Sequence, residues 1–500
     1  MTLEQFRPHP KHLDPESGEP RRADEPGRRI AARRHPHAAA VAGTRILFDI
    51  SDLVYDIGEH ADLTGIARVQ SSIVLSILTN ELLPHANLIF LSFDHKKRSL
   101  VAIPTGFLFT LLEDLLLPKS QRLVSFPAEE ARHGHLPGAQ EFDGAGILDD
   151  GNASVLCLLG TAWVHQDYLY RVLDFKRRFG TKFVMTVHDL MPIYARETGD
   201  RDDASVFEEF MGRALRHADH VLSISENTAT DVKRYVRSLQ ISEPPMTVTR
   251  NGSSFAEFLP QGGAVGAIRP YNVPERFVLF VATIEGRGNH QLMLDIWRRM
   301  IEDGDDPPDL VCVGRLGWNS SAFISSLAEA GYLDVRVRLL GAVSNADLKM
   351  LYSRCLFTVG PTSDQGWDLP VGESLAMGKI CVSSDHASVA EIAGEFGVYI
   401  DIASVEQSLK TIRGLIADAP AREKLEARIR RGYKPVTWRS AAEKIIAACL
   451  AAPDTAWAEP CPYPAIPIPP KSAFAGSTAI PMGPANCCCL GSRGRGAGFF

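Results

Sequence analysis

Short apolar runs alternate with amphipathic stretches through the first half of the chain. Four apolar runs predict buried β-strands: RILFDIS (45–51), VLCLLG (155–160), KFVMTVHDL (182–190) and HVLSIS (220–225). Two amphipathic stretches predict helices: GIARVQSSIVLSILTNELL (65–83) and FEEFMGRALRHA (207–218). Strands that are apolar on both faces, with helices between them, predict a parallel sheet covered on both sides. Residues 95–154 fit this alternation poorly, so we expect an insertion there.

The same alternation starts again after a Gly- and Pro-rich break near residues 258–274. Six further runs predict strands: 276–284, 309–317, 337–343, 356–362, 379–384 and 397–401. A long helical stretch is expected at 404–432, and SAAEKIIAACLA (440–451) predicts a closing helix. Two capping boxes predict helix starts, Ser388 with Glu391 and Ser404 with Gln407.

The pattern predicts an α/β protein with two doubly wound sheets. At 500 residues the chain is too long for one ordinary core. Two such sheets in tandem leave a cleft, with the carboxyl ends of both sheets facing it, and a ligand is expected there.

Both ends of the chain differ in composition from the middle. Residues 1–43 are rich in Arg, Pro and acids and predict a disordered N-terminal arm. Residues 453–500 are rich in Pro and Gly and predict a flexible tail. The tail carries consecutive cysteines at 487–489, for which lipidation, metal binding and an unstructured end without function all stay open.

Charge and cysteine content narrow the function classes. The formal net charge is -7, so no global field favours nucleic acid. The nine cysteines include no C-x-x-C pair, which argues against a zinc or redox motif and favours a reducing compartment. No apolar run is long enough to span a bilayer. We expect a cytoplasmic location, including the inner face of the cytoplasmic membrane through peripheral contact.

One stretch carries a family resemblance. TSDQGWDLPVGESLAMGKICVSSDHASVAEIAG (362–394) resembles the donor-binding signature of the large retaining glycosyltransferase group 1 (family 4), which has the GT-B fold. It is similar to the mannosyltransferase-like branch of bacterial polysaccharide and O-antigen assembly. Six other segments agree with that branch in kind and order: 63–70, 186–193, 223–232, 248–254, 282–290 and 339–355. The resemblance covers residues 44–452.

The resemblance implies the domain organisation and the reaction. Residues 44–257 would form an N-terminal Rossmann-like acceptor domain with the insertion at 95–154, and 258–275 the linker. Residues 276–435 would form the nucleotide-sugar-binding domain, closed by a helix at 436–452. The enzyme would move a mannose-like sugar from a nucleotide sugar to a glycan or lipid-linked acceptor, with retained configuration and front-side attack. It would need neither a metal nor a cofactor, since protein cations stabilise the leaving diphosphate.

The matched positions predict donor-binding residues. Pro370 begins a short helix whose positive end would face the diphosphate, and Gly366 lets the loop backbone approach closely. In the family, the carboxylate matching Glu373 takes both ribose hydroxyls. Arg287 is the candidate diphosphate cation, and the set is completed by Gln365, Asp368 and Leu369.

Two residues of the first half join this set. His188 follows the apolar run KFVMTV and resembles the family histidine that faces the donor sugar, although a lone histidine is more often a satisfied core residue. Gly65 would let a loop pass close to the donor phosphate, and an ordinary strand-to-helix turn explains it equally well.

The sequence departs from the family at two positions. Gln365 stands where the family has Glu, and Gly288 stands where it has Lys. Arg315 is a candidate to offset the lost lysine. An active transferase with another donor and a catalytically impaired homologue that binds nucleotide sugar or a partner protein therefore both stay open. A nicotinamide-dependent dehydrogenase is excluded, because no G-x-G-x-x-G joins a strand to a helix.

Overall fold

The computed structural model describes residues 43–63, 65–165, 167–194, 201–254, 258, 272–317, 320–363 and 366–453. All of them belong to one compact unit, Ala39–Phe500. Nearly all of the predicted N-terminal arm and of the tail, most of the linker, and Gln365 lie outside the described residues, and so do the three consecutive cysteines of the tail.

The first sheet has eight strands in the order β4-β3-β2-β1-β5-β6-β7-β8. Its bounds are β1 Arg45–Asp49, β2 Leu88–Asp94, β3 Ser99–Ile103, β4 Gln140–Glu141, β5 Ser154–Leu158, β6 Lys182–Val187, β7 His220–Ser223 and β8 Met246–Val248. Strands β2, β1, β5, β6, β7 and β8 pair in parallel. The central strands are buried because their side chains are apolar on both faces, as expected.

Residues 95–154 break the parallel pattern. Here β3 pairs antiparallel with β2, and β4 antiparallel with β3, so this region extends the sheet by two strands at one edge. The sequence pattern predicted no strand at β2, β3, β4 or β8. The expected parallel sheet is present, and the region that fitted the alternation poorly adds antiparallel strands, because a short connection such as β2 to β3 permits only an antiparallel neighbour.

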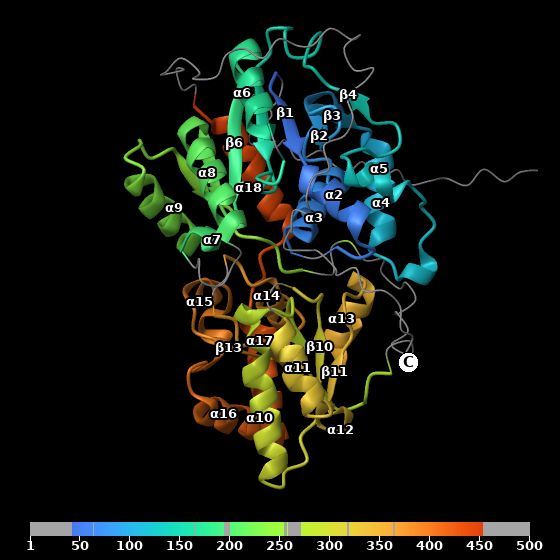
Figure 1. Ribbon diagram of the computed structural model, residues 1–500, viewed down its shortest axis with the longest axis vertical. Helices are drawn as coiled ribbons and strands as arrows, with labels where there is room; N and C mark the ends of the chain where they lie inside the picture. Colours follow the sequence, from blue (N-terminus) through green and yellow to red (C-terminus); the bar gives the residue numbers. More distant parts are fainter. Residues whose placement is uncertain are drawn as a thin grey trace, which may run out of the picture. The chain divides into compact units, whose positions relative to one another are not determined.

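Helices surround this sheet in Figure 1, where β6 and α6 lie side by side. Their bounds are α2 Ser51–Glu59, α3 Gly65–Thr79, η1 His85–Asn87, α4 Thr105–Leu115, η2 Lys119–Gln121, α5 Ala128–Arg132, α6 Tyr168–Phe179, α7 Met191–Tyr194, α8 Arg201–His217 and α9 Glu226–Ser238.

The second sheet has six parallel strands in the order β11-β10-β9-β12-β13-β14. Its strands are β9 Phe277–Val281, β10 Asp309–Val313, β11 Val337–Leu339, β12 Thr358–Gly360, β13 Cys381–Ser384 and β14 Val398–Ile400. All six lie within the predicted runs.

The helices of the second half are η5 Gly286–Gly288, α10 His290–Glu302, α11 Ser321–Glu329, α12 Tyr332–Val335, α13 Asn345–Arg354, α14 Leu369–Ala376, α15 Ala387–Ala393, η6 Gly394–Phe396, α16 Val405–Ala417 and α17 Ala419–Gly432. The predicted stretch 404–432 is thus two helices. It divides at Asp418, whose carboxylate accepts from the backbone N of Ala421 at 2.9 Å and so caps α17.

Of the two predicted capping boxes, one is present only as an N-cap, since the backbone N of Ser404 donates to the Asp401 carbonyl, and the other is absent. Ser404 caps α16 by accepting from the backbone N of Gln407 at 3.2 Å. Ser388 instead lies inside α15, whose N-cap is His386. Glu391 caps a helix of the first half: its carboxylate accepts from the first backbone N–H groups of α9 at 2.9 and 2.8 Å. A carboxylate at a helix N-terminus satisfies donors that the helix leaves unpaired.

The last helix, α18 Trp438–Ala451, returns to the first sheet, where it packs against α3, β5 and β7. In Figure 1 it lies, in red, among the blue and green elements of the first half. Lys182 at the start of β6 donates to the carbonyl of Ala452 at 2.6 Å. Among the described residues, no helix combines the length and apolarity needed to cross a membrane.

Candidate active site

A cavity of about 240 Å³ is lined by residues that follow the strands of both sheets. From the first half it takes residues of α3 and of the turn after β6, and from the second half residues after β9 and β10 and at the start of α14. The carboxyl ends of parallel strands meet at one edge of a sheet, so this is where the doubly wound pattern predicted a ligand site.

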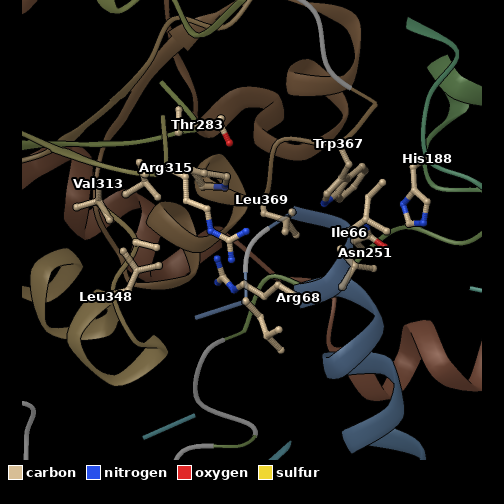
Figure 2. Close-up of a pocket in the computed structure, with 18 of the residues that line it drawn as sticks. Ile66, Arg68, His188, Asn251, Thr283, Val313, Arg315, Leu348, Trp367 and Leu369 are labelled. Atoms are coloured by element: carbon tan, nitrogen blue, oxygen red, sulfur yellow. The ribbon is translucent and has the colours of Figure 1, made fainter. Parts of the chain in front are cut away.

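The cavity has three chemically different zones. Val313 and Leu348 form an apolar side, and Trp367 and His188 line the opposite side (Figure 2). The guanidinium groups of two arginines lie between these sides, Arg68 from α3 and Arg315 from the turn after β10. An elongated ligand with an apolar ring, an anionic centre and a polar end would match this order.

His188 lies directly after β6, and its ring lines the cavity. Its Nε2 donates to the carbonyl of Leu159 at 2.9 Å. Burial lowers the pKa of His188, and the contact with Leu159 opposes that shift only in part. The imidazole is therefore neutral at pH 7, and with the proton on Nε2 its Nδ1 is a hydrogen-bond acceptor.

The loop before α14 lies directly against His188. A Cβ on Gly366 would come within 1.8 Å of the His188 carbonyl oxygen and 3.0 Å of the Asp189 Cβ. The close approach that was predicted for Gly366 is thus an approach to the end of β6. Asp189 accepts from the backbone N of Met191 at 3.1 Å and orients the turn into α7. Gly65 opens α3 with φ of 54° and lines the cavity.

The start of α14 is fixed by Asp368. This buried carboxylate accepts from the Thr362 hydroxyl at 2.9 Å and from the backbone N of Val371 at 3.4 Å. Burial raises the pKa of Asp368 to about 6. Leu369 and Pro370 line the cavity beside it, whereas Asp368 does not line it. Asp368 therefore positions the helix that carries the predicted donor-binding residues.

Glu373 lies one turn into α14 and is buried, with 3% exposure. One carboxylate oxygen pairs with Arg68, and the other accepts from the Tyr352 hydroxyl at 3.0 Å. Burial raises the pKa of Glu373, while Arg68 and Tyr352 oppose that shift. Glu373 does not line the cavity, but its partner Arg68 does.

Two further arginines line the cavity. Arg315 donates to Asp56 of α2 at 3.1 Å and also to the carbonyl of Asp62, so it connects the second half to the first. Arg287, the predicted diphosphate cation, pairs with Glu285 in the turn after β9. Arg315, which was expected to offset the missing lysine, thus lines the cavity, and Arg68 lines it from the first half.

Gly288 has little room for a side chain. A Cβ there would lie 2.8 Å from the ring of His290 and 3.2 Å from the Thr283 carbonyl oxygen. The His290 ring is buried and stacks on Phe280 with centroids 4.1 Å apart. A lysine at 288 would have to displace this stacked ring.

Several residues that line the cavity were not predicted from the sequence, and Arg68, Asn251 and Trp367 are the most informative of them. Each lies inside a segment that carried the resemblance, and only neighbouring residues were selected there. The indole Nε1 of Trp367 is buried without a hydrogen-bond partner among the described residues. A buried N–H without a partner is unfavourable and is commonly satisfied by a ligand or water. Among the described residues, no group of three or more His, Cys, Asp or Glu is placed to hold a metal ion.

The chain is similar to known glycosyltransferases in sequence and in fold. Residues 268–432 match the family described as Glycosyl transferases group 1. The chain is 24% identical over 292 residues to the O-antigen chain mannosyltransferase B of Escherichia coli, covering 57% of this chain and 75% of that protein. It is 29% identical over 212 residues to a lipopolysaccharide core biosynthesis mannosyltransferase of Rhizobium leguminosarum bv. viciae, covering 41% of this chain and 56% of that one.

A serotype-specific mannosyltransferase of Escherichia coli is 24% identical over 236 residues, and the match spans only 29% of its length. Among solved structures, the sucrose-phosphate synthase of Thermosynechococcus elongatus superposes with a TM-score of 0.54 and 15% identity, covering 81% of this chain and 98% of that one. This likeness shows the GT-B fold.

The expected GT-B fold is therefore confirmed, and the expected resemblance to the group 1 glycosyltransferases is confirmed over residues 268–432. Residues 268–432 of this chain match the glycosyl transferases group 1 family, and the chain is similar to bacterial mannosyltransferases.

Proposed function

We propose that this protein is a retaining glycosyltransferase that moves a mannose-like sugar from a nucleotide sugar to a glycan or lipid-linked acceptor. The observation that carries the proposal is the order of the three zones in the cavity: an apolar side, a cationic centre, and a side with His188 and Trp367. A nucleotide sugar has the same order of parts, with a flat base whose ring faces are apolar, a diphosphate and a hexose.

The cationic centre suits the diphosphate. Arg287 and Arg315 line the cavity together with Leu369 and Pro370 at the start of α14. Guanidinium groups and backbone N–H groups at a helix N-terminus are the usual protein partners of phosphate oxygens. They can stabilise the charge that develops on the leaving diphosphate, so the transfer needs no metal.

The side with His188 suits the transferred sugar. Its neutral imidazole can accept from a sugar hydroxyl through Nδ1, and the Trp367 N–H can donate to another. In the proposed front-side reaction, the acceptor oxygen bonds to the anomeric carbon as the bond to the phosphate oxygen breaks. The acceptor proton passes to that phosphate oxygen.

The two halves would divide the work. Residues 276–435 would bind the donor, because they carry most of the cationic groups and the matched family segment. Residues 44–257 would bind the acceptor on the cytoplasmic side, where a peripheral contact with the membrane would reach a lipid-linked glycan. The named roles of the O-antigen and lipopolysaccharide relatives support this class of acceptor.

A second candidate, an impaired homologue that binds nucleotide sugar without turnover, is favoured by one observation. The Glu373 carboxylate is already paired with Arg68 and Tyr352. Incubation of the purified protein with GDP-mannose and a panel of other nucleotide sugars separates the candidates. We expect hydrolysis or transfer that continues in EDTA, with the released sugar in its original anomeric configuration by NMR. Binding without turnover would support the impaired homologue, and no binding would refute both.

A further inference from the structure

One ion pair joins the two halves across the cavity. Arg68 stands on the first turn of α3, and its guanidinium pairs with Glu373 of α14, 305 residues further along the chain. The Arg68 side chain is 13% exposed and that of Glu373 is 3% exposed. Solvent therefore screens this pair little, and each charge depends on the other for neutralisation.

The surroundings of Arg68 favour an anion. In Figure 2 the guanidinium groups of Arg68 and Arg315 point toward one another in the centre of the cavity, and Arg287 also lines it. Among the described lining residues, Asp189 is the one carboxylate. Like charges that face each other repel, so a dianionic group between them would be attracted by both.

The second half lacks a cation at residue 288, where the resembled family has a lysine. The chain has Gly288 there, and His290 closes the space that a longer side chain would need. The second half therefore does not supply this cation at residue 288, whereas Arg68 reaches the cavity from the first half.

We propose that Arg68 is a donor-binding residue that changes partner when the nucleotide arrives. Without donor it neutralises Glu373, and with donor it moves to the diphosphate while Glu373 accepts from the ribose hydroxyls. This rests on the proposed function, because it assumes that the cavity takes a nucleotide sugar.

The exchange leaves neither charge unpaired. Glu373 keeps the Tyr352 hydroxyl at 3.0 Å and gains ribose hydroxyl donors in place of Arg68. Arg68 trades a carboxylate for phosphate oxygens, which its planar fork binds equally well. An anion in the centre of the cavity thus releases Glu373 for the ribose, so the two parts of the nucleotide should bind with positive coupling.

The test measures binding of guanosine, inorganic pyrophosphate and GDP by calorimetry and NMR titration, with UDP and uridine as a second base. The wild-type protein is compared with Arg68→Gln, Glu373→Gln and the matched surface control Arg428→Gln. Arg428 pairs with the exposed Glu395 and does not line the cavity. Thermal unfolding of each variant without ligand checks that it is folded.

We expect Arg68→Gln to weaken pyrophosphate and GDP by about tenfold or more, with guanosine unchanged or tighter, since one charged hydrogen bond is worth at least that factor. Glu373→Gln should weaken guanosine and GDP and leave pyrophosphate unchanged or tighter, because Arg68 then has no carboxylate to leave. In the wild type, saturating pyrophosphate should tighten guanosine binding, and this coupling should vanish in Arg68→Gln. Arg428→Gln should match the wild type throughout.

Two results overturn the inference alone: wild-type coupling that is absent, or an Arg68→Gln variant that loses all three ligands equally. If Arg68→Gln does not fold, Arg68→Lys keeps the charge beside Glu373 but loses the fork. It should weaken pyrophosphate several-fold and spare guanosine, and equal affinities for pyrophosphate would refute the role of Arg68. A folded wild-type protein that binds none of these ligands would refute the proposed function itself.

Discussion

The two halves of the molecule hold their acidic side chains in different ways. On the side of the second sheet, Asp368 finds its partners Thr362 and Val371 within six residues along the chain. On the side of the first sheet, Asp52 of α2 accepts from the Thr161 hydroxyl at 3.0 Å and lies 3.3 Å from His165. Those partners are more than a hundred residues away in sequence.

Among the described residues, the first half is also richer than the second in buried titratable groups. Burial raises the pKa of Asp49 to about 7, even though Ser51 donates to it. Burial also acts on Asp52, but His165 and Thr161 outweigh it and lower its pKa to about 2. His95, whose ring centroid is 4.5 Å from that of His165, has its pKa lowered to about 4 by burial.

The two halves therefore differ in how far apart in the sequence their interacting residues lie. A site built from one continuous segment can be kept as a segment, and the family match at 268–432 covers only that side. The first side depends on pairs of distant residues, so a change at one position requires a change at another. We infer that a substitution in the second half can be accommodated within one segment, whereas a substitution at Asp52 constrains residues far along the chain.

The largest expected effect is at the pair that joins the two sides. Glu373→Ala removes the partner of the mostly buried Arg68, and breaking a buried ion pair typically costs about 3–5 kcal/mol of unfolding free energy. Urea denaturation measures this. The exposed pair Glu395 with Arg428 is the control, and Glu395→Ala should cost less than about 1 kcal/mol. Equal losses in the two variants would show that the pair of Arg68 and Glu373 contributes no more to stability than an exposed pair.

The second effect compares the two raised carboxyl groups by their pH dependence. A folded-state pKa above the unfolded one means stability that is complete at low pH and lost as pH rises through the folded pKa. The pH range over which this stability is lost extends up to about pH 7 for Asp49 and up to about pH 6 for Asp368. Asp49→Asn and Asp368→Asn should each abolish this loss, which is about 1.4 kcal/mol for every tenfold difference in proton affinity between the folded and unfolded chain. Chemical denaturation from pH 4.5 to 8 measures it, and parallel curves for wild type and variants would contradict the raised pKa values.

The third effect concerns the contact between the loop before α14 and the end of β6. Gly366→Ala places a Cβ 1.8 Å from the His188 carbonyl oxygen, so the backbone must shift, at a cost of about 1–3 kcal/mol. Turnover should fall together with stability, since His188 moves. Gly414→Ala in α16 is the control, because an added Cβ there would have no neighbour within 4 Å outside the backbone of its own helix. This variant should be more stable than the wild type by up to about 1 kcal/mol. An unchanged melting temperature for Gly366→Ala would show that the two sides are not in contact.

The smallest effect is expected from restoring the residues of the family. Gln365→Glu with Gly288→Lys should give no gain in donor affinity, because a side chain at 288 collides with His290 and Arg68 already supplies a cation. Calorimetric titration with GDP tests this. A gain of tenfold or more, about 1.4 kcal/mol, would show that the two departures are defects.

Local signals were sufficient for the second sheet and for much of the first. The six strands of the second sheet were predictable because each is a continuous apolar run. The edge strands β3 and β4 were not, since they are short and leave the parallel rhythm. Glu391 was assigned to its own helix because its local spacing fits a capping box, whereas its partners lie on α9.

The candidate site shows the same limit. Gly366, Leu369, Pro370, Arg287 and His188 were predicted from motifs, and the structure brings them to one cavity. Their roles stay predictions, as does that of Gln365, which lies outside the described residues. Arg68 was missed because its significance depends on Glu373, 305 residues away, and no local pattern reports such a pair.

The return of α18 to the first sheet has a consequence for folding during synthesis. Its buried face, which includes Trp438, Ile445 and Ile446, covers α3 and β7. The ribosome makes α18 about 190 residues after β8, which takes roughly 10–40 s at ordinary elongation rates. Throughout that interval the first sheet is complete in sequence but lacks its last covering helix. During this time the nascent chain exposes an apolar surface that chaperones can bind. The second half must be synthesised before α18 can cover the first sheet.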